Sequence, residues 1–423
     1  MAVTPGQVDV LREARQRSYA EGGIFWFGAD QLAIFDPAVA QAVNAHNFSD
    51  LALPDQLSDI LRGREGKKIY WREVRELWLS QVRRLSEPAQ LELLAARMEK
   101  LLDERAGSER DLVWVGQEVI SRSLLPVVIN GLDEKDTARV LADQDQKIRF
   151  NVVVGPPDGL FKRLGNLWVQ LLVGNVVRRE LRGRAAGTRP RQLDLTDPIV
   201  DFLPELGIGR AVDAVTGILT AIGGPPGGAA ACLIYALLRY PEWRAKLAEE
   251  LAGFSLAELC AAPTRHAPIA HRFVRETLRL WSPTPIVGRA VRKELEAGGH
   301  CLRPGQEYLL SPDILHHDPR FWKDPDLFDP DRWLSGAERA PHSAACYAPF
   351  GWAPRGCIGA GLGSAQLILL TYLLLRRFQI ELATPDQIGM ALPSMPVPQN
   401  LKGTLTRISP ETLTGGFQNA GPG

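Results

Sequence analysis

The chain has 423 residues, of which 45% are hydrophobic and 23% charged, so it is long enough to bury a sizeable core in one large domain or two average ones. Lysine plus arginine and aspartate plus glutamate both number 49, and this zero net charge excludes an electrostatic case for nucleic acid as the main partner. The five cysteines are odd in number and widely spaced, which argues against a disulfide framework and, with no CxxC or Cys/His pair at zinc-site spacing, against a zinc site.

The first 22 residues are charged and lack the apolar core of a signal peptide, and we find no uninterrupted apolar run of about 20 residues. We therefore expect a cytoplasmic protein without a membrane anchor. Apolar β-formers on both sides of Gly28-Ala29-Asp30 predict two short strands within residues 24–36. Pro37, at a first helical position, predicts a helix over 38–47.

Apolar residues at helical spacing predict a series of helices in the first half of the chain, over residues 70–85, 88–103, 110–130, 134–148 and 158–185. Residues 208–238 are apolar nearly all round, which is typical of a helix buried through the middle of a protein. Gly223–Gly228 contains two prolines, each of which removes a hydrogen bond and costs about 3 kcal/mol in a helix interior. That helix should kink or open there.

In the second half of the chain, apolar spacing and turn residues predict helices over 243–251 and 268–280 and short strands and turns from 284 to 310. Residues 318–333 should form an irregular meander. A cysteine loop and an apolar helical run, 365–378, follow, and then one or two strands. We expect a mostly α fold with minor β in one domain, 1–413, that is β-rich over about 20–50 and helical over about 70–380. The glycine-rich tail 414–423 should be disordered.

Cys357 lies in a glycine-rich turn just before that helical run. Unpaired amides at a helix N-terminus favour a thiolate, so this cysteine could serve as a nucleophile, a metal ligand or a redox thiol. The plain alternative is a small buried residue. A nucleophile without a cofactor would need a nearby base, and His342, the nearest histidine in sequence, has no spacing that indicates pairing.

Three signals come in a fixed order towards the C-terminus. Glu276 and Arg279 lie three residues apart on one helix face, Arg332 follows within Phe328–Trp333, and then comes Phe350-Gly351-Trp-Ala-Pro-Arg-Gly-Cys-Ile-Gly. Together they resemble the cytochrome P450 family: the Glu-x-x-Arg of its K helix, its meander motif and its haem loop. Trp71-x-x-x-Arg75 is similar to the motif of its C helix.

The resemblance implies the cytochrome P450 fold, with haem b between a long central helix and the cysteine-loop helix. Cys357 would be the axial thiolate ligand of the haem iron, where anionic sulfur pushes electron density onto the metal. Glu276, Arg279 and Arg332 would form a buried ion network that supports the loop. The residues that would contact the cofactor, three of them guanidinium partners for its propionates, are Arg355, Arg75, Arg289, Trp71 and Phe350.

The sequence departs from the family pattern in two places. Ala353 replaces the usual second glycine of the haem loop. More importantly, Gly224 and Pro225 occupy the positions of the acid–alcohol pair that delivers protons during dioxygen activation. Neither residue can carry a proton. We expect a widened groove over the haem there, with freed backbone carbonyls open to water or substrate.

Three kinds of reaction stay open: an oxygen insertion whose protons come from substrate or water, a peroxide-driven oxidation, and a redox-neutral isomerisation or dehydration. Fatty-acid peroxygenases carry an arginine in this helix, and Pro225-Pro226 lacks it. We therefore rank fatty-acid peroxygenation below oxygen insertion. A haem-binding protein without catalysis is a further alternative. The resemblance to soluble bacterial P450 proteins implies a small organic substrate, such as a secondary metabolite.

An oxygen-using enzyme of this family needs an electron donor, and an acidic ferredoxin or flavodoxin would suit a basic surface. Basic residues cluster in and before the helix over 70–85, at Arg62, Arg64, Lys67, Lys68, Arg72, Arg83 and Arg84. Interspersed acids leave a solvated charged helix as the alternative. The substrate pocket should be lined by 51–60, 218–224 and 283–287.

Overall fold

The computed structural model describes residues 5–47, 71–152, 160–291, 293–354, 356–392 and 395–408. Its helices are α1 (Pro5–Glu21), α2 (Pro37–His46), α4 (Trp71–Leu85), α5 (Pro88–Asp103), α6 (Leu112–Val128), α7 (Glu134–Val152), α8 (Leu160–Ala185), α9 (Asp197–Asp201), α10 (Leu203–Ile222), α11 (Pro225–Arg239), α12 (Pro241–Ala252), α13 (Leu256–Ala261), α14 (Pro263–His266), α15 (Pro268–Leu280), α16 (Pro312–His316) and α17 (Ala360–Arg376). Short 3-10 helices are η2 (Pro330–Trp333), η3 (Ala344–Cys346) and η4 (Pro385–Gln387).

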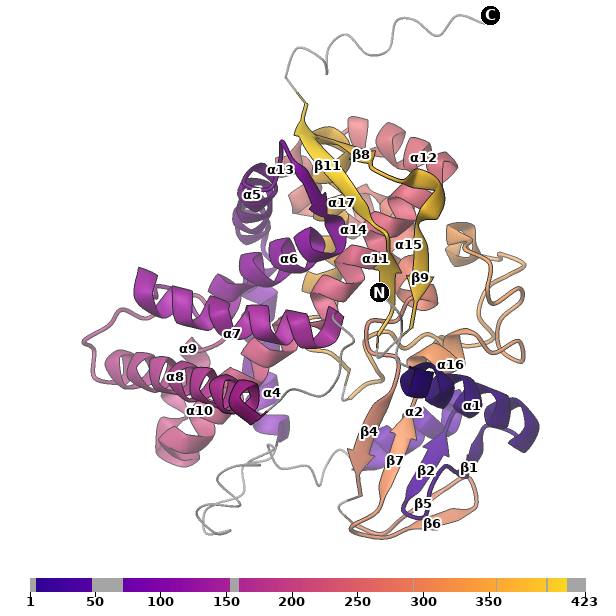
Figure 1. Ribbon diagram of the computed structural model, residues 1–423. Coiled ribbons are helices and arrows are strands. Elements are labelled where there is room, and N and C mark those ends of the chain that lie inside the picture. Colours follow the sequence, from indigo (N-terminus) through magenta and orange to yellow (C-terminus); the bar gives the residue numbers. More distant parts are fainter. Residues whose placement is uncertain are drawn as a thin grey trace, which may run out of the picture.

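The strands are β1 (Ile24–Trp26), β2 (Gln31–Ile34), β3 (Glu109–Asp111), β4 (Val287–Ala290), β5 (Leu295–Ala297), β6 (His300–Leu302), β7 (Glu307–Leu310), β8 (Phe378–Leu382), β9 (Gly389–Ala391), β10 (Val397–Gln399) and β11 (Lys402–Arg407). Helices fill the left and upper parts of the molecule in Figure 1, and the sheet β1-β2-β7-β4 lies at the lower right. The prediction of a mostly α fold with a minor β part is confirmed.

The four-stranded sheet joins distant parts of the chain. The predicted hairpin forms from β1 and β2, and β7 pairs with β2 in parallel, with Leu32 opposite Tyr308. β4 then pairs with β7 in the antiparallel sense, with Arg289 opposite Tyr308. Directly opposed residues share one face of a sheet, and Tyr308 is fully buried, so this pairing turns Arg289 toward the interior.

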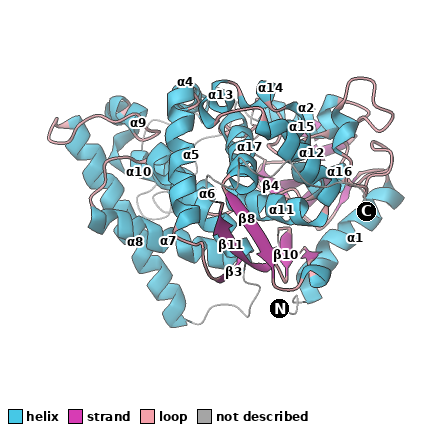
Figure 2. Ribbon diagram, turned by 90° about the horizontal axis from the view of Figure 1, so that it is seen from above, coloured by secondary structure: helices cyan, strands magenta, loops and turns pink. Residues whose placement is uncertain are grey.

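The helical part has one continuous apolar core, and its middle is formed by α6, α11, α15 and α17 (Figure 2). The helix predicted over 208–238 is two helices, because the chain leaves helical geometry at Gly223 and Gly224 and Pro225 begins α11. By length and composition, Leu203–Arg239 is the one described stretch that could cross a membrane, but 78% of its most apolar window is buried, as in the core helix of a folded domain.

The backbones of α6 and α11 come very close to each other, and glycines permit it. A Cβ atom added to Gly227 would lie 2.8 Å from the Cα of Gln117, and one added to Gly116 would lie 3.2 Å from the amide nitrogen of Ala231. Real side chains do not tolerate the first distance, so the contact requires glycine at position 227. The proline–glycine segment therefore fixes the packing of the central helix as well as its break.

A buried carboxylate, Glu276 on α15, holds the meander against the helical core. It pairs with Arg279 at 2.8 Å and with Arg332 at 2.9 Å, and all three side chains are fully buried. Trp333 Nε1 and the backbone N–H of Asp329 also donate to it, at 3.1 and 3.0 Å. The remaining guanidinium N–H groups donate to meander carbonyls such as that of Leu327. Every member is thus satisfied, as burial of charge requires.

Two local differences from the sequence predictions have simple causes. The sequence did not predict α1, because its apolar positions are few; it is held by the Arg15–Asp313 ion pair of 2.8 Å and by Tyr19, which donates to the carbonyl of His317. Helix α17 begins at Ala360, five residues before the apolar run, since Gly361 and Gly363 do not interrupt it. It ends before Phe378, which belongs to β8.

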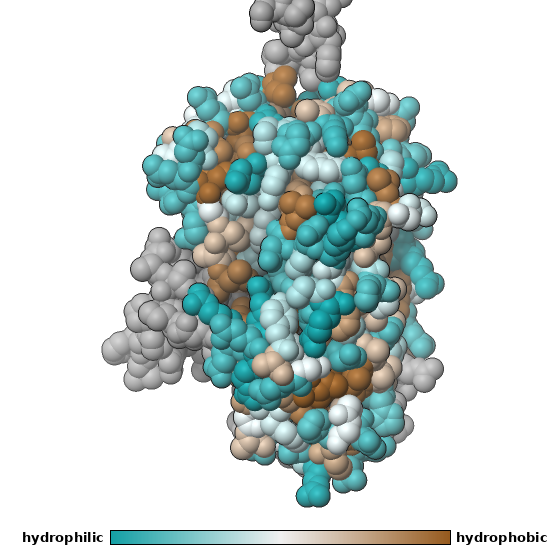
Figure 3. Space-filling view, turned by 90° about the vertical axis from the view of Figure 1, so that its right-hand side faces the viewer, coloured by the Kyte–Doolittle hydropathy of each residue, from teal (hydrophilic) through white to brown (hydrophobic). Residues whose placement is uncertain are grey.

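The face in Figure 3 is largely hydrophilic, and its hydrophobic residues form small, separate patches. Such scattered apolar residues are normal for the surface of a folded domain. On that face, therefore, the described residues present no broad apolar surface.

We predict that Glu276→Ala lowers the free energy of unfolding by about 3–5 kcal/mol, because Arg279 and Arg332 would stay buried without a counter-charge. Denaturant unfolding at matched cofactor content measures the change. Asp103→Ala is the control, since it removes one partner of Arg407 in an exposed ion pair and should cost less than about 1 kcal/mol. Equal losses in the two variants would contradict the role assigned to Glu276.

Candidate functional site

Cys357 lies in a tight loop immediately before α17. Its N–H donates to the carbonyl of Phe350 at 2.7 Å, and the loop turns at Gly351, whose φ of 71° favours glycine. Asn44 from α2 donates to the carbonyl of Trp352 at 3.0 Å, so the loop is attached to the β-rich part. The described part of the loop thus presents the Cys357 side chain, which is solvent-accessible, at the beginning of α17.

A chain of hydrogen bonds connects this loop to the Glu276 network. The imidazole of His316 donates from Nδ1 to the carbonyl of Arg279 at 3.0 Å and accepts at Nε2 from the N–H of Ala348 at 2.9 Å. Burial lowers the pKa of His316 well below its ordinary value, so the ring is neutral and can serve as donor and acceptor at once. The carbonyl of Ala348 then accepts from Gly351, which places the turn.

Opposing effects act on the sulfur of Cys357. Burial by surrounding protein raises its pKa, whereas an N–H from Gly359 and the positive charge of Arg75 lower it, and the net pKa stays above that of an ordinary thiol. Without a metal the group is therefore a thiol at neutral pH. A positive metal ion would reverse that balance, because coordination deprotonates sulfur.

Two cations of the predicted set lack a carboxylate partner among the described residues. Arg75 on α4 is half-buried, and burial lowers its pKa against an opposing effect of Cys357. Among the described residues, Arg289 on β4 has a buried Nε without a partner and a single hydrogen bond, from Nη1 to the carbonyl of Gly288. Burial lowers the pKa of Arg289 as well. Such cations are costly unless an anion approaches them.

These residues fit haem b. Its iron would take the Cys357 sulfur, and its two propionate carboxylates would supply the anions that Arg75 and Arg289 lack. The structure brings Arg75 close enough to Cys357 for their charges to interact. Arg355 lies outside the described residues, and so does the side chain of Trp71. Phe350 contributes its carbonyl to the loop and packs with its ring against the helical core.

Hydrogen bonds bridge the break in the central helix, and the sequence predictions did not include this bridge. Gly224 is buried, and its carbonyl accepts from the N–H of Gly228 at 3.0 Å. With the Gln117 amide assigned in the orientation that pairs both of its groups, the Gly224 carbonyl also accepts from the amide nitrogen at 3.3 Å, and the amide oxygen accepts from Gly228 at 3.2 Å. The Gly224 carbonyl is thus not free, because Gly228 and Gln117 of α6 donate to it. The two prolines remove the donors of the carbonyls four residues earlier, those of Ala221 and Ile222, and freed carbonyls stay a prediction there. Neither Gly224 nor Pro225 offers a side chain that carries a proton.

Gln117 is the site residue that the sequence predictions missed. It is 1% exposed and lies on α6 where that helix contacts α11. The available signal was a polar residue directly after Gly116 in a strongly apolar run, Leu112–Val115. That signal does not reveal which backbone groups the amide would bind.

The other predicted pocket residues are only partly described. Residues 51–60 lie outside the described ranges, as do Arg62, Arg64, Lys67, Lys68 and the side chain of Arg72. Leu219 and Pro283 are buried, whereas Ile218 and Val287 are half-buried. Arg83 and Arg84 are exposed on α4 and are accessible to a partner.

Comparisons with known proteins agree on one family. A family model described as Cytochrome P450 matches residues 229–405. The chain is 31% identical to thromboxane-A synthase of Sus scrofa over 42% of this chain and 33% of that protein. It is 29% identical to sterol 14alpha-demethylase of Mycolicibacterium vanbaalenii over 46% of this chain and 44% of that protein. The matches thus span less than half the length of these curated relatives.

Solved structures extend the similarity of fold to nearly the whole chain. The retinoic acid-bound cyanobacterial CYP120A1 superposes with a TM-score of 0.75 at 17% identity, over 93% of this chain and 94% of that one. The haem domain of cytochrome P450DA superposes with a TM-score of 0.76 at 18% identity, over 96% and 94%.

We predict that alkylation of Cys357 in the haem-free protein follows a pH profile displaced above that of a free cysteine peptide, whose pKa is about 8.5. The reason is that burial raises the pKa of this thiol and iodoacetamide reacts with the thiolate. Arg75→Met should displace the profile further upward by removing a nearby positive charge. Mass spectrometry of the Cys357 peptide measures both, and a profile below that of the peptide would contradict the assigned surroundings.

We also predict that Gly227→Ala lowers the free energy of unfolding by about 1–3 kcal/mol, because the new methyl group forces α6 and α11 apart. Gly217→Ala is the matched control: Gly217 lies on α10 with nothing within 4 Å of an added Cβ, and this change should stabilise by about 0.5–1 kcal/mol. Thermal and denaturant unfolding compare the two. Similar stability of both variants would be inconsistent with the close helix contact.

Proposed function

We propose that this chain, which belongs to the cytochrome P450 family, is a haem-thiolate oxidoreductase that acts on a small organic molecule. Haem b is the cofactor of this family. The observation that carries the proposal is the combination of the Cys357 loop with Arg75 and Arg289, two half-buried cations that have no carboxylate partner among the described residues. A thiolate and two unpaired guanidiniums match the three anchors that a haem with two propionates needs.

When bound through the Cys357 thiolate, the haem would supply oxidation chemistry, because anionic sulfur increases the electron density at iron. The protein's own contribution is positioning. The Gly359 N–H donates to the sulfur and limits its basicity, while Arg75 adds positive charge beside it. By family resemblance, Arg355 and Trp71 would join Arg75 and Arg289 at the propionates.

The reaction that we favour is an oxygen insertion or related oxidative change that uses dioxygen and electrons from a ferredoxin or flavodoxin. The exposed Arg83 and Arg84 on α4 support a basic docking surface for an acidic donor. Because Gly224 and Pro225 carry no protons, substrate hydroxyls or ordered water would supply them. A cytoplasmic location and a secondary-metabolite substrate belong to this proposal, which the relatives support only through parts of their length.

A second candidate is oxidation driven by peroxide, or a redox-neutral rearrangement of a peroxide-like substrate. The observation that favours it is the buried, bridged backbone at Gly224, which puts a hydrogen-bonded carbonyl and a proline where the family has an acid and an alcohol. A peroxide already carries the reduced oxygen–oxygen bond, so this chemistry needs no proton relay for dioxygen. The same loop and the same cofactor would serve both candidates.

The deciding experiment has two parts. We expect the reduced, carbon monoxide-bound protein to show the red-shifted Soret band of thiolate-ligated haem, and we expect Cys357→Ser to abolish it while Cys301→Ser, at another exposed cysteine, leaves it intact. A colourless protein would end the proposal. Substrates found by Soret shift are then turned over with a ferredoxin system or with hydrogen peroxide.

Efficient turnover with peroxide and none with the ferredoxin system would replace the first candidate by the second. For the dioxygen reaction, Pro225→Thr together with Gly224→Asp should raise the share of electrons that appears in product, since it restores an acid and an alcohol at these positions. The ratio of product to reductant consumed measures this share.

A further inference from the structure

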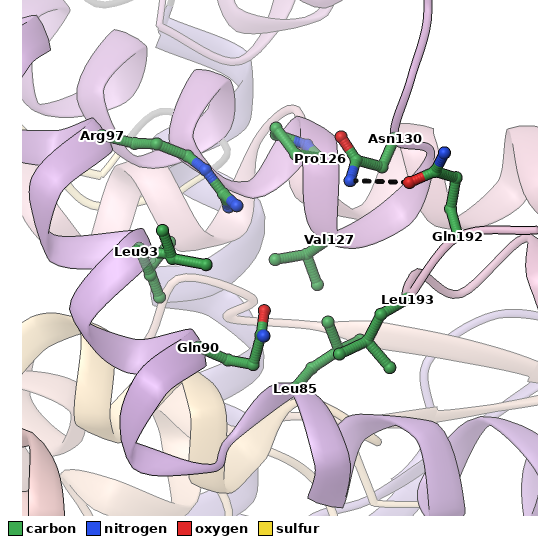
Figure 4. A pocket seen from close by; sticks show the side chains of 10 residues that line it. Leu85, Gln90, Leu93, Arg97, Pro126, Val127, Asn130, Gln192 and Leu193 are labelled. Atoms are coloured by element: carbon green, nitrogen blue, oxygen red, sulfur yellow. Dashed lines mark hydrogen bonds between the residues drawn. The ribbon is translucent and has the colours of Figure 1, made fainter.

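A small cavity lies apart from the cysteine loop and from the break in the central helix. Its volume is about 180 Å³, and it opens between α5, the C-terminal end of α6 and the loop that contains Gln192 (Figure 4). Six of its ten lining residues are apolar, and four carry amide or guanidinium groups: Leu85, Leu93, Leu94, Pro126, Val127 and Leu193, with Gln90, Arg97, Asn130 and Gln192. No carboxylate is among them.

Arg97 gives the cavity its charge. Figure 4 shows its guanidinium reaching from α5 toward the side of Pro126 and Val127. Its one hydrogen bond runs from Nη1 to the carbonyl of Ser123 at 3.5 Å, the outer limit for such a bond, and no described carboxylate pairs with it. Burial lowers the pKa of Arg97, and no acidic group opposes that effect. The cation is therefore partly desolvated without compensation.

The amides around Arg97 add donors. Asn130 Nδ2 donates to the side-chain oxygen of Gln192 at 3.4 Å, and the side-chain oxygen of Asn130 accepts from the N–H of Gly131 at 2.9 Å. This arrangement occupies the two amide oxygens and leaves the Gln192 amide nitrogen as a donor without a partner in the described part of the chain. The Gln90 amide, also unpaired there, points into the same space in Figure 4. Arg97 and Gln90 thus face the cavity, whereas the Gln192 amide nitrogen lies beside Gly131.

Arg97 differs from the other described arginines whose pKa is lowered by burial in having no anion assigned to it. Burial lowers the pKa of four described arginines: Arg75, Arg97, Arg289 and Arg332. Arg332 has Glu276, and Arg75 and Arg289 suit the carboxylates of haem. Of these four, Arg97 has no anion assigned to it, and it lines a cavity.

We propose that this cavity binds a small organic anion, a carboxylate joined to a short hydrocarbon part. The carboxylate would pair with the Arg97 guanidinium and accept from the Gln90 amide nitrogen. The hydrocarbon part would lie against Val127, Leu94 and neighbouring apolar side chains. This site is separate from the reaction at Cys357 and does not depend on it.

The test uses the haem-loaded full chain and isothermal calorimetry, with benzoate as probe. Benzamide is the neutral probe of the same shape, and sulfate is the anion without a hydrocarbon part. We expect saturable 1:1 binding of benzoate, and weaker binding of both other probes, by about tenfold or more for benzamide. Benzamide that binds as tightly as benzoate would overturn the proposal, and so would the absence of saturable benzoate binding.

Variants locate the binding. Arg97→Met keeps the length of the side chain but removes its charge, and should weaken benzoate by about tenfold or more. Leu93→Trp adds bulk at the half-exposed rim and should block entry without touching the charge. Lys100→Met, at an exposed cation on α5 itself, is the control and should bind as the unmodified chain does.

Benzoate held beside the haem is distinguished by the Soret band, which binding in this cavity should leave unchanged. Unaltered benzoate affinity in both Arg97→Met and Leu93→Trp would refute the site. Arg97→Met should also unfold at the same temperature as the unmodified chain or at a higher one when no anion is present, because it removes a half-buried cation that has no carboxylate partner among the described residues.

Discussion

The position of the Cys357 loop depends on the hydrogen bonds and ion pairs of the buried Glu276 carboxylate. This carboxylate accepts hydrogen bonds from five donors, two of them on Arg279 and the others on Asp329, Arg332 and Trp333. Because a buried carboxylate needs this many partners, it fixes the position of the meander relative to α15. A chain of hydrogen bonds runs from the carbonyl of Arg279 through the neutral ring of His316 to the turn before Cys357. The Glu276 network thus helps to fix the position of the Cys357 sulfur without contacting it.

The same cost of burying charge explains what the protein binds. Where a guanidinium has its carboxylate within the chain, as Arg184 has with Asp194 at 2.7 Å, the pair is complete and purely structural. Where the chain leaves a half-buried guanidinium without one, an anion from outside can complete the pair. Arg75 and Arg289 fit the cofactor in this way, and Arg97 is the basis of the second site that we propose.

Much of this arrangement could be predicted from the sequence, because it rests on local patterns. Helix 88–103 and helix 268–280 were predicted at their observed bounds, since proline opens each and apolar spacing is regular. The motif residues Glu276, Arg279 and Arg332 were predicted to meet, and the structure brings them together. Long-range backbone contacts were not predictable: the bridging of the helix break by Gln117 depends on a close approach between helices that are about a hundred residues apart in the chain.

The bridge formed by Gln117 has a consequence for how this protein can change. Its amide satisfies the backbone on the far side of the break, so the identity of residues 224 and 225 is coupled to a residue on another helix. Substitutions at neighbouring, contacting sites are not additive. A lineage, or an engineer, that restored a continuous helix would leave the Gln117 amide buried and unpaired. Such a change therefore costs about 1–3 kcal/mol for the unpaired amide unless Gln117 is replaced as well.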